Sequence, residues 1–147
     1  MRHGNSGRKL SRTAAHRDAL YANLVTALFT HGRIETTEAK AKEVRSVADA
    51  AVRWGIDVAD LVAKGDKATP AEKTRIVHAK RMARKVLKTD TAMSKLFGQI
   101  GPHFKARAAT SKKGGGYTRV LKTRFRRGDA ASMAFVELIG LAPSAAA

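Results

Sequence analysis

HRDALYANLVTALFTHGRIET, residues 16–36, sets the architecture of the chain. Its large apolar side chains recur at i, i+3, i+4 and i+7, the spacing of one helix face: Leu20, Tyr21, Leu24, Val25, Leu28 and Phe29. This spacing predicts a helix that begins near Ser11 or Thr13 and packs on one side. Gly32 is placed to end it, because glycine adopts the left-handed conformation of a helix end without strain. The RIET segment, residues 33–36, then favours a short strand.

A second helix is predicted for residues 38–54, because Thr36 or Thr37 can cap its start and Gly55 can stop it. Its apolar stripe is narrow and consists of Val44, Val47, Ala48, Ala51 and Val52. Residues 56–67 are compatible with one or two further helical turns ending at Gly65, or with a packed loop.

The clearest helix start is at Thr69, where Pro70 and Glu72 complete the pattern of a capping box. We expect this helix to run to about Leu87, with an apolar face formed by Ile76, Val77, Met82, Ala83 and Val86. Its opposite face is cationic, with Lys80, Arg81, Arg84, Lys85 and Lys88. Asp90 is expected to cap a shorter helix that buries Met93, Leu96, Phe97 and Ile100 and is closed by Gly101 and Pro102.

The last part of the chain is typical of strands. Residues 112–116, KKGGG, indicate a glycine hinge, and YTRVLKTRF (117–125) and SMAFVELIG (132–140) are rich in β-branched and aromatic residues. The second run is apolar on both faces apart from Glu137, which favours an inner strand paired antiparallel with the first; residues 33–36 could add a third, edge strand. The elements predict an α+β fold of one domain, residues 1–147, with the order α-β-α-α-α-β-β and a small mixed sheet.

Charge is distributed unevenly along the chain. The 29 Lys and Arg exceed the 12 acids by a formal +17, yet ten of those acids lie between Asp18 and Asp90. Two basic stretches, residues 1–17 and 103–127, contain no acid at all. Such an excess destabilises a compact chain through self-repulsion unless a polyanion screens it, so the charge predicts a nucleic-acid partner.

The phosphate-binding residues are expected in those two stretches. They are Arg2, His3, Arg8, Lys9, Arg12, His16, Arg17, Lys105, Arg107, Lys112, Lys113, Arg119, Lys122, Arg124, Arg126 and Arg127. Residues 1–12 predict a flexible basic arm, for which a disordered terminus or an organellar transit peptide is the alternative, and residues 142–147 predict a disordered tail.

Motifs for chemistry are not found. The five histidines are scattered without metal-ligand spacing, the KKGGG run lacks the Gly-Lys-Ser/Thr of a phosphate loop, and Asp129 and Glu137 have no third carboxylate nearby in sequence. Asp129 is better explained as stabilising a turn at residues 127–129, and the lone Trp54 as an edge of the core. We therefore expect no catalytic residues, metal or cofactor. No apolar run approaches the length of a membrane span, and the absence of cysteine suits a reducing compartment.

Three segments carry a family resemblance: RHGNSGRKLSRTAAHRDALYANLVTALFTHGRIETTEAKAKEVR (2–45), KLFGQIGPHF (95–104) and GGYTRVLKTRFRRGDAASMAFVELI (115–139). They resemble the bacterial large-subunit ribosomal protein seventeen family. The resemblance implies the same element order in two layers, binding of large-subunit ribosomal RNA, and a position near the exit of the peptide tunnel beside ribosomal protein thirty-two. Residues 55–67 depart from the shorter link of the family.

The function expected from these observations is that of a structural, non-enzymatic constituent of the large ribosomal subunit in the cytoplasm. It binds ribosomal RNA and neighbouring ribosomal proteins, with no membrane and no small-molecule substrate. The alternative is a basic nucleoid-type DNA-binding protein, which a dimer with a DNA-inserting ribbon would favour. An RNA-processing enzyme comes third, because no motif supports it.

Overall fold

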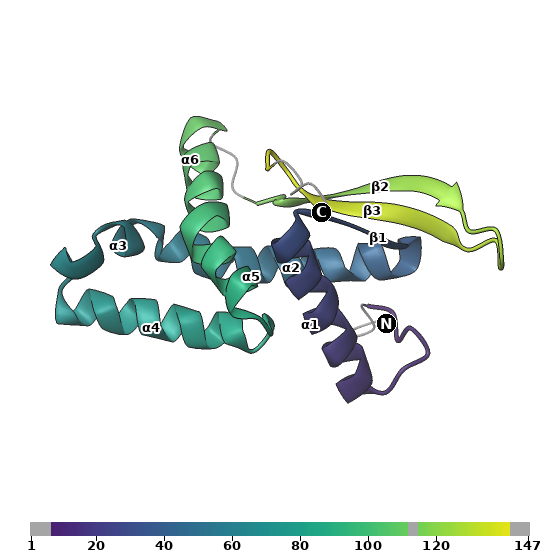
Figure 1. The fold of residues 1–147 in the computed structure, drawn as a ribbon, viewed down its shortest axis with the longest axis horizontal. Helices are drawn as coiled ribbons and strands as arrows, with labels where there is room; N and C mark the ends of the chain where they lie inside the picture. Colours follow the sequence, from purple (N-terminus) through teal and green to yellow (C-terminus); the bar gives the residue numbers. More distant parts are fainter. Residues whose placement is uncertain (1–6, 112–114, 142–147) are drawn as a thin grey trace, which may run out of the picture.

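The computed structural model describes residues 7–111 and 115–141 and has two layers, one of helices and one a small sheet (Figure 1). Its elements are α1 (Ala14–His31), β1 (Arg33–Thr37), α2 (Glu38–Asp57), α3 (Ala59–Ala63), a 3-10 turn η1 (Gly65–Lys67), α4 (Pro70–Arg84), α5 (Asp90–Lys95), a π-helical segment η2 (Leu96–Ile100), α6 (Gly101–Ser111), β2 (Thr118–Phe125) and β3 (Ser132–Leu138). The α+β class is confirmed. The expected element order also holds, with α3 as a short extra turn and α5, η2 and α6 as one continuous helical run.

The first helix ends where the sequence predicts. Gly32 has φ of 79°, and its backbone N–H donates to the carbonyl of Leu28 at 2.7 Å. Val25, Leu28 and Phe29 are buried in the common core. The predicted stripe therefore does face the interior, and the chain turns directly into β1.

The sheet has the order β1-β3-β2, so the apolar run at 132–138 is the inner strand as expected, and β1 is the third strand at one edge. Val136 pairs with Ile34 on one side and Val120 on the other. The sheet is antiparallel throughout rather than mixed, because both outer strands run against β3. Ala134, Val136 and Leu138 face the helical layer, in which α2 packs on all three strands (Figure 1).

Two predicted helix ends are wrong, and both involve glycine. Gly55 lies inside α2, which continues to Asp57, and Gly101 begins α6 instead of closing the preceding helix. A Cβ on Gly101 would lie 2.7 Å from the carbonyl carbon of Gly55, so the two glycines permit close packing of two helices. Pro102 has no backbone N–H to donate, and the change from α- to π-helical hydrogen bonding in η2 comes directly before it.

The capping box at the start of α4 is confirmed. Glu72 N–H donates to Thr69 Oγ1 at 3.3 Å, and Thr69 N–H donates to Glu72 Oε2 at 2.8 Å. The helix ends at Arg84, slightly before the predicted Leu87, and Thr89 rather than Asp90 caps α5. The core face of α4 is built on Ala79 and Ala83, whereas Val77, expected inside, is 45% exposed.

Candidate nucleic-acid interface

The described part of the basic arm lies on the first turns of α2. Arg8 donates to the carbonyl of Ala39 at 3.5 Å, and its guanidinium is 4.0 Å from the carboxylate of Glu43. Lys9 is exposed, while Arg12 is partly buried and donates to the carbonyl of Leu10 at 2.8 Å. Arg2 and His3 lie outside the described residues. These contacts fix where the arm leaves the body of the protein.

The far end of the β2–β3 hairpin carries a second group of predicted cations. Lys122 Nζ lies 3.0 Å from Glu38 at the start of α2, and Arg124 lies 3.4 Å from Glu35 on β1. Arg126 donates twice to Asp129, at 2.9 and 2.5 Å, and Asp129 also accepts from Ala131 N–H at 3.3 Å. Asp129 therefore stabilises the turn, as the sequence indicates. Arg127 is exposed in this turn.

The arm and the hairpin meet at the N-terminal end of α2. A hollow of about 430 Å³ is lined there by Arg8, Thr37, Glu38, Ala39, Ala131 and Ser132, which come from the arm, from the end of β1, from the start of α2 and from the start of β3. Figure 1 shows the start of the described chain and the hairpin turn on the same side of the molecule. We call this region the arm–hairpin surface, defined by Arg8, Lys9, Lys122, Arg124, Phe125, Arg126 and Arg127.

Carboxylates orient the cations of the arm–hairpin surface. Hydrogen bonds from Lys42 and then from Lys122 lower the pKa of Glu38 from 4.5 to about 2. The bidentate contact with Arg126 lowers the pKa of Asp129 from 3.8 to about 2. Both acids stay ionised at neutral pH, so they hold the long cationic side chains in place while leaving their outer sides exposed to solvent.

Comparison with known proteins identifies the family. The family model described as "Ribosomal protein L17" matches residues 20–139, which include α2, α4 and the whole sheet. The chain belongs to the ribosomal protein L17 family. The protein named "Large ribosomal subunit protein bL17" from Desulfotalea psychrophila is 43% identical over 147 residues, covering 100% of this chain and 96% of the relative. The bL17 proteins of Trichlorobacter lovleyi and Pelobacter propionicus are 43% and 41% identical over 139 residues, covering 95% of this chain and 94% and 91% of the relatives.

Other predicted cations of this L17 family member are not part of the arm–hairpin surface. Lys105 lies 2.5 Å from Asp60, and Arg107 donates to the carbonyls of Gly115 and Gly116 at 2.8 and 2.9 Å. Arg107 thereby holds the segment that enters β2. Both residues are on α6, a helix that lies away from the hairpin turn (Figure 1). Lys112 and Lys113 lie outside the described residues.

Arg119 is also placed apart from the turn. It lies 3.6 Å from Glu137, which Arg33 approaches from the other edge of the sheet at 2.6 Å. The face of the sheet that carries these three side chains is the one opposite the helices. His16 and Arg17 are in the first turn of α1, the former exposed and the latter partly buried.

Two features of the surface lie outside the phosphate-binding residues predicted from the sequence. Phe125 is 71% exposed between Arg124 and Arg126, at the end of β2 where the pairing with β3 is irregular. The cationic face of α4 lies outside the two acid-free stretches at the chain's ends, although residues 73–89 contain seven bases and no acid.

Residues 7–111 and 115–141 contain neither a cluster of metal-ligating side chains nor a helix suited to cross a membrane. No group of His, Asp or Glu side chains in these ranges is arranged to hold a metal ion. None of the helices described is both long enough and apolar enough to cross a membrane.

Proposed function

We propose that this chain is a non-catalytic structural constituent of the large ribosomal subunit that binds and stabilises large-subunit ribosomal RNA through phosphate contacts. Membership of the ribosomal protein L17 family supports the assignment to the ribosome, as do relatives whose names place them in the large subunit. The location is then cytoplasmic, within the ribosome.

The observation that carries the RNA-binding proposal is the convergence of arm and hairpin at the start of α2. Arg8 of the arm contacts Ala39 and lines a hollow with Ala131 and Ser132 at the start of β3, and Lys122 of the hairpin pairs with Glu38 at the same end of α2. The exposed ring of Phe125 adds a surface on which an unpaired base can stack. Cations beside an exposed aromatic ring suit folded RNA better than regular duplex DNA, which offers no splayed base.

The mechanism is electrostatic and depends on prior orientation of the side chains. Lysine and arginine lose much side-chain entropy when a ligand fixes them, and contacts with Glu35, Glu38 and Asp129 have already reduced that freedom. A phosphate that approaches can accept charge-assisted hydrogen bonds from the remaining N–H groups of these exposed side chains. The α+β body fixes the distance between the arm and the hairpin, and so determines where the bound RNA strands lie relative to each other.

The proposed partners include neighbouring large-subunit proteins. The family resemblance favours ribosomal protein thirty-two, with a seat near the exit of the peptide tunnel. No small-molecule substrate, metal or cofactor is part of this proposal. Arg2, His3, Arg12, His16, Arg17, Lys105, Arg107, Lys112, Lys113 and Arg119 remain proposed RNA contacts outside the arm–hairpin surface.

Two experiments test this function. In a lysate of cells that express the chain, the protein should sediment with large subunits when low magnesium separates the subunits; sedimentation with the nucleoid instead would support the DNA-binding alternative. Binding to large-subunit RNA fragments should weaken with salt by roughly 0.7 to 0.9 log units per log unit for each phosphate contact. A total slope below about two would contradict the electrostatic mechanism.

A truncation separates binding from folding. Removal of residues 2–9 takes away Arg2, Arg8 and Lys9 but leaves every core residue in place. We expect the truncated protein to unfold at nearly the same denaturant concentration and to enter large subunits poorly. Equal incorporation of the two proteins would show that the arm does not contribute to RNA binding.

A further inference from the structure

We propose that the groove between α4 and the α5–η2 run is a second RNA site, one that receives the base of an unpaired nucleotide while its flanking phosphates bind Lys80 and Arg81. The inference rests on the proposed function, because it needs ribosomal RNA as the ligand. It concerns a surface that shares no residue with the arm–hairpin surface.

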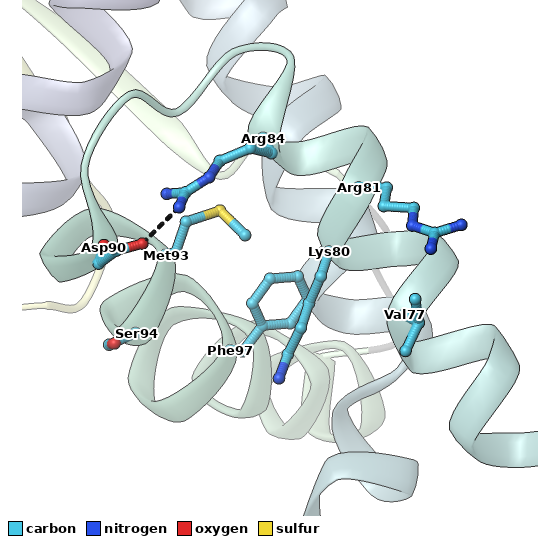
Figure 2. A pocket seen from close by; sticks show the side chains of 8 residues that line it. All are labelled: Val77, Lys80, Arg81, Arg84, Asp90, Met93, Ser94 and Phe97. Atoms are coloured by element: carbon cyan, nitrogen blue, oxygen red, sulfur yellow. Dashed lines mark ion pairs between the residues drawn. The ribbon is translucent and has the colours of Figure 1, made fainter.

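The groove has an apolar interior of a suitable size. Its volume is about 430 Å³, within the range of small-ligand sites, and its apolar lining comes from Val77, Met93 and Phe97. Figure 2 shows Met93 and the ring of Phe97 side by side between Arg84 and Lys80. Phe97 is 5% exposed, so it is held rigidly by the core and offers only a small part of its ring at the floor. A flat base could lie in this open groove against these side chains.

Val77 is the least expected of these residues. It is 45% exposed on a helix face that otherwise presents charge, three residues before Lys80 and four before Arg81. At this spacing the three side chains are neighbours on one helix face. Val77 is thus an exposed apolar side chain at the edge of a groove, with cations on the next turn. This combination matches a nucleotide, because a nucleotide has an apolar base face and a charged backbone.

The cations of the groove differ in how they are engaged. Arg84 lies 2.6 Å from Asp90, and this ion pair closes one end of the groove (Figure 2). Among the described residues, no carboxylate forms an ion pair with Lys80 or Arg81. The long basic run of α4, without an acid from Lys73 to Thr89, adds positive potential around them. The positive charge of this helix therefore suits a polyanion as its partner.

An unpaired nucleotide fits better than an acidic protein segment. A helix that docks in a groove uses apolar anchors at i, i+3, i+4 and i+7, and the three apolar residues here are too few to receive such a row. A single base needs only one such pocket, and it stacks or packs without sequence preference. A regular RNA duplex keeps its bases stacked inside, so the site should select bulges and loops.

The experiment compares variants of the full-length protein in binding to large-subunit RNA fragments. Lys80→Gln with Arg81→Gln should weaken binding about tenfold at moderate salt and lower the salt slope by roughly 0.7 to 0.9 for each lost contact. Val77→Ser should weaken binding without changing the slope, because it removes apolar contact and no charge. The matched control is Arg53→Gln with Lys67→Gln, which removes the same charge from exposed positions outside the groove.

Crosslinking locates the base. RNA fragments that contain 4-thiouridine should, on irradiation, give adducts on the peptide that includes Met93 and Phe97 or on the one that includes Val77. The groove proposal is overturned if the groove variants bind RNA as well as the control variant and no such adduct forms. If the wild type still shows a steep salt slope, the RNA-binding function stands. A wild-type slope below about two would overturn both. A photoreactive residue at position 77 that captures protein rather than RNA in assembled subunits would also overturn it.

Discussion

The backbones of Gly55 and Gly101 are in direct contact, where the last turns of α2 meet the start of α6. A Cβ on Gly101 would lie 2.7 Å from the carbonyl carbon and oxygen of Gly55, and one on Gly55 would lie 2.8 Å from Leu96 Cδ1. Real Cβ atoms do not approach other atoms this closely. The distance between the two helices is therefore one that only glycine at these positions allows.

Substitution of Gly101 should destabilise the fold. For Gly101→Ala we expect a loss of about 1–3 kcal/mol in the free energy of unfolding, since the obstacle is backbone and cannot rotate away. Gly98→Ala is the matched control, because it lies in the same helical run and a Cβ added there would have no neighbour within 4 Å. The control should be neutral or stabilising by about 0.5–1 kcal/mol. Urea unfolding measures both, and equal values would show that the helices can separate without cost.

The capping box should contribute measurably to stability. Thr69→Ala removes the acceptor of Glu72 N–H and should cost about 0.5–2 kcal/mol. The control is Thr74→Ala, an exposed position whose hydroxyl donates only to the carbonyl of Pro70 within the same helix. We expect the control to stay within about 0.5 kcal/mol of the wild type. Thermal unfolding compares the two, and a loss at Thr74 as large as that at Thr69 would remove the capping argument.

The low pKa of Glu38 predicts a pH dependence. Its pKa is lowered from 4.5 to about 2 by hydrogen bonds from Lys42 and Lys122, so folding favours the ionised form. The resulting stability is present above pH 4.5 and is lost as the pH falls toward 2. Because the two lysines that pair with Glu38 are largely exposed to solvent, the effect should be small and reduced by salt. Between these pH values, the free energy of unfolding should change less with pH for Glu38→Gln than for the wild type, and Lys122→Gln should be intermediate. The same pH dependence in all three proteins would contradict the prediction.

The hairpin arginines should matter for binding and little for folding. Arg124→Ala with Arg126→Ala should weaken RNA binding by a factor that shrinks at high salt, while the free energy of unfolding stays within about 1 kcal/mol. Filter binding at several salt concentrations and thermal unfolding give the two quantities. Arg53→Ala with Lys67→Ala controls for lost charge. A large fall in melting temperature would mean that the contacts with Glu35 and Asp129 serve the fold.

Features that depend on local chemistry were predictable from the sequence. The end of α1 at Gly32 and the capping box at Thr69 each involve atoms within a few residues, so the pattern contains all the information needed. The inner position of β3 was also predictable, since its run is apolar apart from Glu137 whereas the runs that form β1 and β2 carry more charge.

Features that depend on distant partners were not predictable. Glycine is found both at helix ends and at close helix contacts, and the sequence around Gly55 does not distinguish the two. Val77 is exposed because of the rotation of α4 about its own axis relative to α5. The helical spacing of apolar residues does not determine that rotation. For the site, charge density identified the basic stretches, but only the fold separates Arg107, which supports the start of β2, from the cations around the hairpin turn.

The position of β2 at the edge of the sheet has a consequence for the protein before it joins any assembly. An open edge strand is a template on which a second chain can add, and exposed edges promote aggregation. Two copies that met along β2 would bring Arg119, Lys122 and Arg124 of one chain against the same residues of the other. We therefore expect newly made copies to repel one another along β2, which would keep them from pairing through this edge.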